Sequence, residues 1–166
     1  MSVILVEAPR HMGIGIRNVL SQDLPGIMEI ELLAFGGQWD YFQFKASVND
    51  IFLAAVDSAT GALVGFLVAC CCDVARRGII LRVAVHPDYR GRGIATQLLE
   101  ESFWELKKKD LDEVELDVDI LKAGALHLYE KLGFKIVETL SLDFEEDNTF
   151  FIMRRKLGPR GSAMAV

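Results

Sequence analysis

The sequence contains few cysteines, and the three that it has are consecutive: Cys70, Cys71 and Cys72. Because successive side chains on a strand point to opposite faces, this cluster cannot form a framework of disulfides. It also lacks the paired spacing of a zinc site, so we expect no metal site. We interpret the three residues as reduced core cysteines, which are typical of a protein kept in a reducing compartment.

Long apolar runs and an excess of basic residues are also absent. No apolar stretch reaches the ~20 residues that span a bilayer. The N-terminus does not combine a basic region with a long apolar run, as a signal peptide would. The 18 Lys and Arg residues are outnumbered by 24 Asp and Glu residues, which argues against nucleic acid as a partner. We therefore expect a cytoplasmic protein that binds neither a membrane nor nucleic acid.

The 166 residues suffice for one ordinary domain, and no linker or internal repeat interrupts them. We predict a single domain over residues 1–157 and a disordered tail at 158–166. Hydrophobic periodicity predicts strands at 14–20, 51–56, 63–72, 79–85, 114–120, 136–144 and 150–157, with helices ending near 35, 109 and 132. Hairpins and β–α–β crossovers in one chain predict an α/β fold with a mixed sheet and helices on both faces.

The most informative stretch is 81–96, which leads from a β-branched strand through a glycine loop into an amphipathic helix. The first N–H groups of a helix have no internal partner, and the helix dipole adds partial positive charge there. Two glycines let the backbone approach a ligand, and two arginines add donors suited to phosphate. The stretch therefore predicts a site for a phosphate-bearing ligand. A Walker loop and a dinucleotide fingerprint both require residues that are missing here.

Two further patterns bear on a substrate pocket. The strand at 79–85 is apolar except for Arg82, which predicts a central strand buried on both faces. Four aromatic residues follow the pair Gly36-Gly37: Trp39, Tyr41, Phe42 and Phe44. They would either form the wall of a substrate pocket or pack a second short helix onto the sheet, and the sequence leaves both interpretations open.

Two segments together resemble the GNAT superfamily of N-acetyltransferases. Residues 90–95 fit that family's pattern of Gln or Arg, any two, Gly, any one, Gly or Ala, and residues 125–134 resemble its closing helix. The lead-in at 83–89 looks like the family's fourth strand. The resemblance spans roughly residues 13–157 and points to the ribosomal-protein N-terminal acetylase branch. It implies a central mixed, mostly antiparallel sheet of six to seven strands, flanked by about four helices on both faces.

The resemblance implies acetyl-CoA as the acetyl donor. The pyrophosphate would sit on the glycine loop, and the pantetheine arm would lie in a gap where the fourth and fifth strands splay apart. The cofactor-binding residues implied in this way are Val83, Val85, Arg90, Gly91, Arg92, Gly93, Ile94, Ala95 and Thr96. One position departs from the family's pattern, because Lys122 stands where the family often has an Asn that bonds the cofactor arm.

Acetylation of an amine needs a neutral amine and a proton for the departing thiolate. Tyr129 occupies the position of the family's general acid, although a tyrosine there would also pack well under the closing helix. Asp117 resembles a base-acting acidic residue of the same family branch, and Glu115 and Asp119 share its strand parity. A water chain to bulk solvent or His127 would be alternatives to a carboxylate base.

We therefore predict an acetyl-CoA-dependent N-acetyltransferase that moves an acetyl group to a primary amine by direct attack. The backbone N–H of Val85 would hold the oxyanion. Cys70–Cys72 fall on the preceding strand, which disfavours a cysteine-linked intermediate. The alternative functions are a non-catalytic acyl-CoA-binding or sensing module on the same fold, and an interaction scaffold without a ligand.

The acceptor is not specified by the sequence and would be a peptide N-terminus, a lysine or a small amine. An acidic turn at Glu145, Glu146 and Asp147 would suit a cationic acceptor. Single-domain members of the family often pair as homodimers, and the edge strands here would allow such pairing.

Overall fold

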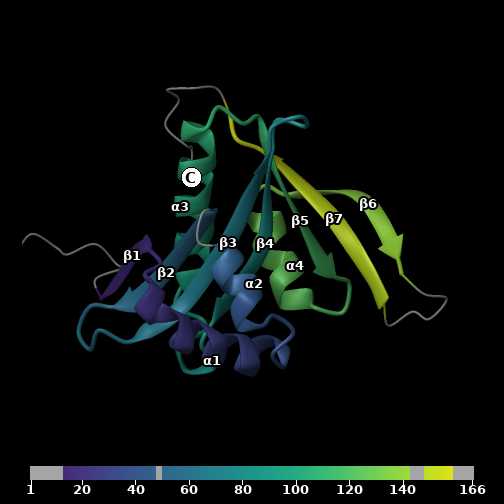
Figure 1. The fold of residues 1–166 in the computed structure, drawn as a ribbon. Coiled ribbons are helices and arrows are strands. Elements are labelled where there is room, and N and C mark those ends of the chain that lie inside the picture. Colours follow the sequence, from purple (N-terminus) through teal and green to yellow (C-terminus); the bar gives the residue numbers. More distant parts are fainter. Residues whose placement is uncertain (1–12, 48–49, 143–147, 159–166) are drawn as a thin grey trace, which may run out of the picture.

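A computed structural model describes residues 13–47, 50–142 and 148–158. The described residues contain a seven-stranded sheet with the strand order β1-β2-β3-β4-β5-β7-β6 (Figure 1). Only β4 and β5 run parallel, and the other neighbouring pairs are antiparallel. The strands are β1 (Ile14–Asn18), β2 (Ile51–Asp57), β3 (Leu63–Cys72), β4 (Arg77–Val85), β5 (Glu113–Asp119), β6 (Lys135–Ser141) and β7 (Thr149–Lys156).

Helices cover both faces of the sheet. They are α1 (Leu24–Phe35), α2 (Tyr41–Ala46), α3 (Ile94–Lys108) and α4 (Ala123–Lys131). On one face, α1 and α2 bury Ile27 and Phe44 against Phe66 of β3. On the other face, Leu98 of α3 and Tyr129 of α4 belong to a second, larger core. The predicted α/β class, with a mixed sheet between helices, is confirmed.

The boundaries of the elements follow from local signals. Helix α1 ends where Gly36 adopts a left-handed φ of 73°, a conformation that glycine adopts at little cost. Helix α2 begins at the capping box formed by Asp40 and Gln43. In β5, Val114, Leu116 and Val118 are buried while the residues between them face outward, as the period-two pattern predicts.

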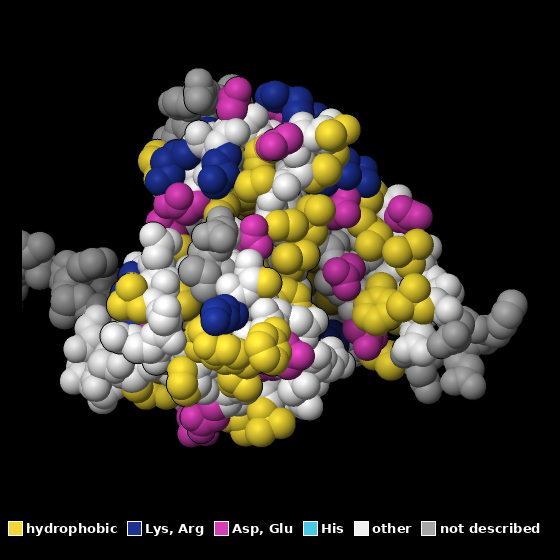
Figure 2. All heavy atoms as spheres, viewed as in Figure 1, with side chains coloured by type: hydrophobic (Ala, Val, Ile, Leu, Met, Phe, Trp, Pro, Cys, Tyr) yellow, Lys and Arg dark blue, Asp and Glu magenta, His cyan; other side chains and the backbone are white. Residues whose placement is uncertain are grey.

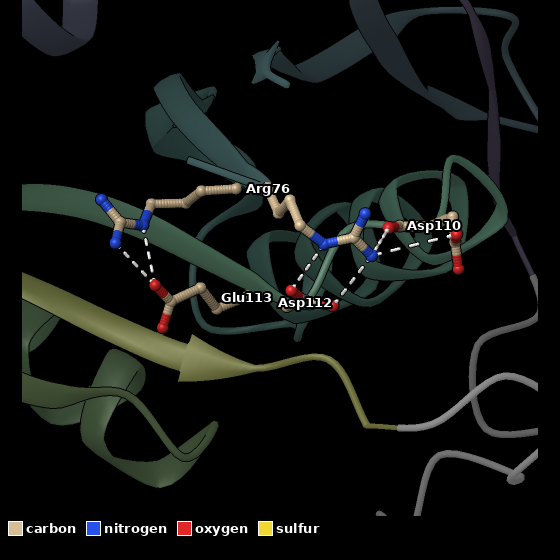
Figure 3. Close-up of polar contacts among 5 residues, drawn as sticks. Arg76, Asp110, Asp112 and Glu113 are labelled. Carbon is tan, nitrogen blue, oxygen red and sulfur yellow. Dashed lines mark hydrogen bonds and ion pairs between the residues drawn. The ribbon is translucent and has the colours of Figure 1, made fainter. Parts of the chain in front are cut away.

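Strands β4 and β5 separate soon after they begin. Their pairing covers only Arg77–Ile79 with Glu113–Glu115, whereas β3 and β4 pair along the whole of β4. Arg77 bridges the paired end, because its guanidinium lies 2.6 Å from the Glu113 carboxylate and 3.1 Å from that of Glu115. Figure 3 shows the pairing with Glu113 beside the pairs that Arg76 makes with Asp110 and Asp112. The splay implied by the family resemblance is therefore present.

Two expectations about β3 and β4 were wrong. Strand β4 is not buried on both faces, because Leu81 is 38% exposed. The register passes from Val68↔Arg82 to Ala69↔Ile80 and leaves Leu81 in a β-bulge, which turns it out of the regular ladder. The cysteines are free thiols, but Cys71 is exposed and its two neighbours are half-buried, because β3 runs on past the core.

The remaining expectations fall partly outside the described residues. The acidic turn at 145–147 and the tail from 159 lie outside them, and the boundary of the single domain stays a prediction. Among the described residues, no helix is long and apolar enough to cross a membrane. The same residues include no group of three or more His, Cys, Asp or Glu side chains suited to hold a metal ion.

Candidate active site

The loop between β4 and α3 exposes backbone at the start of a long helix. Gly91 and Gly93 both have a φ of 76°, and Gly93 is the N-cap of α3. A Cβ added at Gly91 would meet no atom within 4 Å, so the backbone there faces open space. The Arg90 side chain donates to the Val85 carbonyl at 3.2 Å, which ties the loop to the end of β4. This exposed backbone at a helix N-terminus lies where the sequence predicts an anion site.

A cavity of about 740 Å³ opens beside this loop, and we call it the loop cavity. Its walls come from the end of α1, from β4, from the loop with the first turn of α3, and from α4. The residues predicted from the sequence that line it are Val83, Val85, Arg90, Gly91, Gly93, Ile94, Ala95, Thr96 and Tyr129. These residues, widely separated in the sequence, thus share one cavity.

Arg92 is the one predicted cofactor-binding residue that does not line the loop cavity. Its guanidinium carbon lies 4.9 Å from the centre of the Tyr89 ring, and its Nη2 atom donates to the Asp88 carbonyl at 3.3 Å. The side chain therefore braces the loop from outside. Its predicted contact with a phosphate stays a prediction.

The backbone of β4 faces the splay at the predicted positions. The His86 N–H donates to the Val64 carbonyl at 2.8 Å, and Val85 lies opposite Gly65. Because hydrogen-bonded and non-hydrogen-bonded pairs alternate in an antiparallel ladder, the N–H and C=O groups of Val83 and Val85 point away from β3. They point toward β5, beyond the end of the β4–β5 pairing. A ligand in the gap could therefore form hydrogen bonds with the unpaired backbone groups of β4, as a ligand does at the edge of a sheet.

A second cavity of about 540 Å³ lies over β4, β5 and β7, and we call it the β5 cavity. Asp117 and Asp119 line it, together with Gln38 from the segment after α1 and Phe150 from β7. The residues common to both cavities are Ala34, Phe35, Val83, Lys122, Ala125 and Tyr129. The two cavities therefore meet at a shared wall that includes Tyr129.

Tyr129 is almost fully enclosed, with 8% of its surface exposed. Burial raises the pKa of the Tyr129 hydroxyl to about 12, and the negative charge of Asp117 adds to the shift. The hydroxyl is therefore protonated throughout the physiological range. A protonated hydroxyl at the junction of two cavities can donate a hydrogen bond or a proton to a group placed there.

The three β5 carboxylates considered as a base, Glu115, Asp117 and Asp119, have different surroundings. Glu115 accepts a hydrogen bond from Arg154 at 2.6 Å and pairs with Arg77, so it is held in an ion-pair network outside both cavities. Asp119 accepts from the Leu121 N–H at 2.8 Å. Asp117 is exposed and borders the β5 cavity. His127 is exposed and lines neither cavity, which argues against it as a base.

The aromatic segment does not line either cavity. Phe44 is fully buried, with its ring 5.4 Å from that of Phe66 and 5.3 Å from that of Trp39. The packing interpretation is therefore confirmed for these two residues, and the pocket-wall interpretation stays a prediction for Tyr41 and Phe42. Tyr41 and Phe42 are exposed, and hydrophobic side chains gather over α1 and α2 in Figure 2.

Sequence reasoning missed Phe35 and Gln38, which line the β5 cavity from either side of the Gly36-Gly37 pair. The glycine pair was the available signal, since it marks the end of α1 and the start of an exposed segment. Lys122, noted as a departure from the family pattern, borders both cavities, and its Nζ atom lies 4.8 Å from the centre of the Phe35 ring.

Comparison with known proteins gives a consistent result. The model of the acetyltransferase (GNAT) domain matches residues 48–136. The chain is 28% identical to an N-alpha-acetyltransferase of Saccharolobus solfataricus, over 92% of this chain and 99% of that protein.

Solved structures resemble the fold closely. The ribosomal-protein-S18-alanine N-acetyltransferase of Escherichia coli superposes with a TM-score of 0.77 at 23% identity, covering 92% of this chain and 99% of that one. Arabidopsis thaliana NAA60, solved in complex with acetyl-CoA, superposes with a TM-score of 0.76 at 23% identity, covering 86% and 99% of the two chains.

Proposed function

Because this chain belongs to the GNAT acetyltransferase family, an enzyme family that takes its acetyl group from acetyl-CoA, we propose that it acetylates the α-amino group of a peptide N-terminus by direct attack. The observation that carries the proposal is the meeting of the loop cavity and the β5 cavity at Tyr129 and Val83. A donor in the first cavity and an amine in the second would meet there without a covalent enzyme intermediate.

The loop cavity suits acetyl-CoA in its chemistry. The backbone N–H groups of residues 91–95 and the dipole of α3 would hold the pyrophosphate, with Gly91 leaving room for close approach; the Arg90 N–H already donates to the Pro87 carbonyl. The outward-facing N–H and C=O groups of Val83 would bond the amides of the pantetheine arm, since the Val85 carbonyl already accepts from Arg90. When bound, the donor supplies a thioester whose carbonyl carbon is open to attack by an amine.

Tyr129 is the group that we assign as general acid at the sulfur. Its raised pKa keeps the hydroxyl protonated, so it can donate as negative charge develops on the leaving group. The backbone N–H of Val85 would stabilise the oxyanion, because it points into the gap between β4 and β5.

Asp117 is the group that we assign as base or proton relay. An alkyl ammonium must lose a proton before it attacks, and the exposed carboxylate of Asp117 borders the cavity from which the amine would come. The negative charge of Asp117 also contributes to the raised pKa of the Tyr129 hydroxyl, after burial. The candidate acid, Tyr129, and the candidate base, Asp117, therefore border the same cavity.

A peptide N-terminus is favoured over other amines because several relatives that span most of this chain are named for that reaction. They include the N-alpha-acetyltransferase of S. solfataricus and the ribosomal protein bS18 alanine N-acetyltransferase of E. coli, to which the chain is 29% identical over 72% of its length.

The test measures CoA release from acetyl-CoA with peptides of free N-terminus, the same peptides with a blocked N-terminus and an internal lysine, polyamines and single amino acids. We expect turnover with free peptide N-termini. Tight binding of acetyl-CoA without CoA release from any amine would instead support the alternative, a non-catalytic acyl-CoA-binding module.

A further inference from the structure

A buried carboxylate links α1, β4 and the segment between α1 and α2. Glu31 has a fully buried side chain in α1. Its two oxygens accept from Arg82 of β4, at 3.2 Å from Nε and 2.5 Å from Nη2. The same carboxylate accepts from the Trp39 backbone N–H at 3.0 Å. A buried charge is tolerated only when it is paired and hydrogen-bonded in this way, so the arrangement is rigid.

Arg82 is also held by aromatic rings. The centre of the Phe35 ring lies 4.0 Å from the guanidinium carbon, and that of Trp39 lies 5.5 Å from it. These contacts and the bidentate bond to Glu31 fix the plane of the guanidinium. Arg82 and Phe35 border the β5 cavity, so this fixed group forms part of the wall on the acceptor side.

The fixed arginine determines how Gln38 is turned. The Nη2 atom of Arg82 donates to the Gln38 side-chain oxygen at 3.1 Å. Arginine has only donors, so the amide must turn its oxygen toward Arg82 and its NH₂ group away from it. Gln38 itself lines the β5 cavity. The wall of the cavity therefore offers a neutral N–H donor with a defined direction.

We propose that the Gln38 NH₂ group binds the carbonyl oxygen that neighbours the acceptor's amino group, and that Glu31 and Arg82 are its positioning residues. This inference rests on the proposed function and narrows it. An amine that carries an adjacent carbonyl, such as the first residue of a peptide, satisfies the donor, whereas a lysine side chain or a polyamine leaves it unpaired. Acidic Asp117 and Asp119, which also line the cavity, suit the amino group but would not recognise the carbonyl.

The decisive variants are Gln38→Glu and Gln38→Met. Glutamate keeps an oxygen for Arg82 but has no NH₂ group, and methionine keeps the length of the side chain but neither polar group. The assay compares a peptide with a free N-terminal alanine and the same peptide N-blocked with one internal lysine. We expect both variants to raise the KM for the free N-terminus about threefold to tenfold, the loss of one hydrogen bond. The KM for acetyl-CoA should change less than twofold.

The positioning role is tested with Glu31→Gln and Arg82→Lys. Each should raise the acceptor KM as the Gln38 variants do, with kcat and the KM for acetyl-CoA nearly unchanged. The matched control is Asp23→Asn, which breaks the bidentate pair of Asp23 with Arg17 away from both cavities. It should leave both KM values unchanged. Should Glu31→Gln fail to fold, the two Gln38 variants decide the question alone.

The outcomes separate this inference from the proposed function. Turnover of the free N-terminus with an unchanged KM in both Gln38 variants would overturn the inference and leave the acetyltransferase intact. Equal wild-type efficiency on the free N-terminus and the lysine peptide would overturn it as well. Absence of CoA release with every amine would instead overturn the proposed function.

Discussion

Tyr129 is the side chain at which both cavities meet, so its hydroxyl is the first group to test. We predict that Tyr129→Phe lowers kcat about a hundredfold, within the range of a general acid, because only the donor is lost. The affinity for acetyl-CoA, measured by titration calorimetry, should stay within twofold. Tyr41→Phe is the control, since Tyr41 is exposed and lines neither cavity. An unchanged kcat would leave Tyr129 as a packing residue of α4.

Lys122 offers a second test, since it borders both cavities where the family often carries an Asn. A lysine ammonium only donates, whereas an asparagine amide both donates and accepts toward an amide of the cofactor arm. We predict that Lys122→Asn lowers the Kd for acetyl-CoA about threefold in an equilibrium titration. A tenfold rise in Kd would show instead that the lysine charge itself contributes to donor binding.

The site residues that belong to a sequence motif could be predicted. The residues whose orientation depends on contacts with distant parts of the chain could not. Tyr129, Asp117 and eight of the nine residues expected at the cofactor line the cavities, because loop and closing helix carry recognisable patterns. Gln38 was missed because its orientation depends on Arg82, 44 residues away, and Arg82 depends on Glu31, 51 residues away. No local spacing encodes such contacts.

Among the elements, the paired end of β4 and β5 depends on Arg77. Its side chain is 19% exposed and contacts two carboxylates, whereas that of its neighbour Arg76 is 54% exposed. We predict that Arg77→Gln lowers the free energy of unfolding by about 1 kcal/mol, the upper end for a partly exposed ion pair. Arg76→Gln should leave it unchanged. Urea denaturation at neutral pH measures the free energy of unfolding of both variants. Equal losses in the two variants would contradict a special role for Arg77.

The turn between β1 and α1 should show a dependence on pH. The hydrogen bond from Arg17 to Asp23 lowers the pKa of the Asp23 carboxyl, and the Leu20 N–H also donates to it. A lowered folded-state pKa stabilises the protein above the unfolded-state value of about 3.9, and the effect is lost as the pH falls through the folded-state pKa. Asp23→Asn should therefore cost about 1 kcal/mol at pH 7 and nothing near pH 2, in urea denaturation. A difference in unfolding free energy between wild type and variant that is the same at pH 7 and at pH 2 would contradict this prediction.

Elements with strong periodicity were predicted well, and local irregularities were not. The alternation in β5 and the amphipathic face of α3 specify both elements, since one face of each must be buried. The bulge at Leu81 and the exposure of Cys71 were not foreseen. Both depend on how far the neighbouring strands and helices extend, which the strand's own residues do not encode.

For the whole molecule, two short motifs were sufficient to predict the fold, because residues 90–95 and 125–134 occur in the family's order and separation. The identity of the acceptor was not predictable, since the β5 cavity is assembled from α1, β4, β5 and β7. A cytoplasmic location and a homodimer stay predictions from the sequence.

The splay has a consequence for the dynamics of the molecule. The sheet is close to being two sheets, β1–β4 and β5–β7, joined by three residue pairs at one end. Acetyl-CoA bound between β4 and β5 would bridge the two halves of the sheet where strand pairing is absent. It would therefore reduce the local unfolding of either half on its own. In amide hydrogen exchange, acetyl-CoA should therefore protect β4 near Val85 and β5 near Val118 more than β2, and uniform protection would contradict this. The binding of acetyl-CoA would then also hold the two halves of the sheet together.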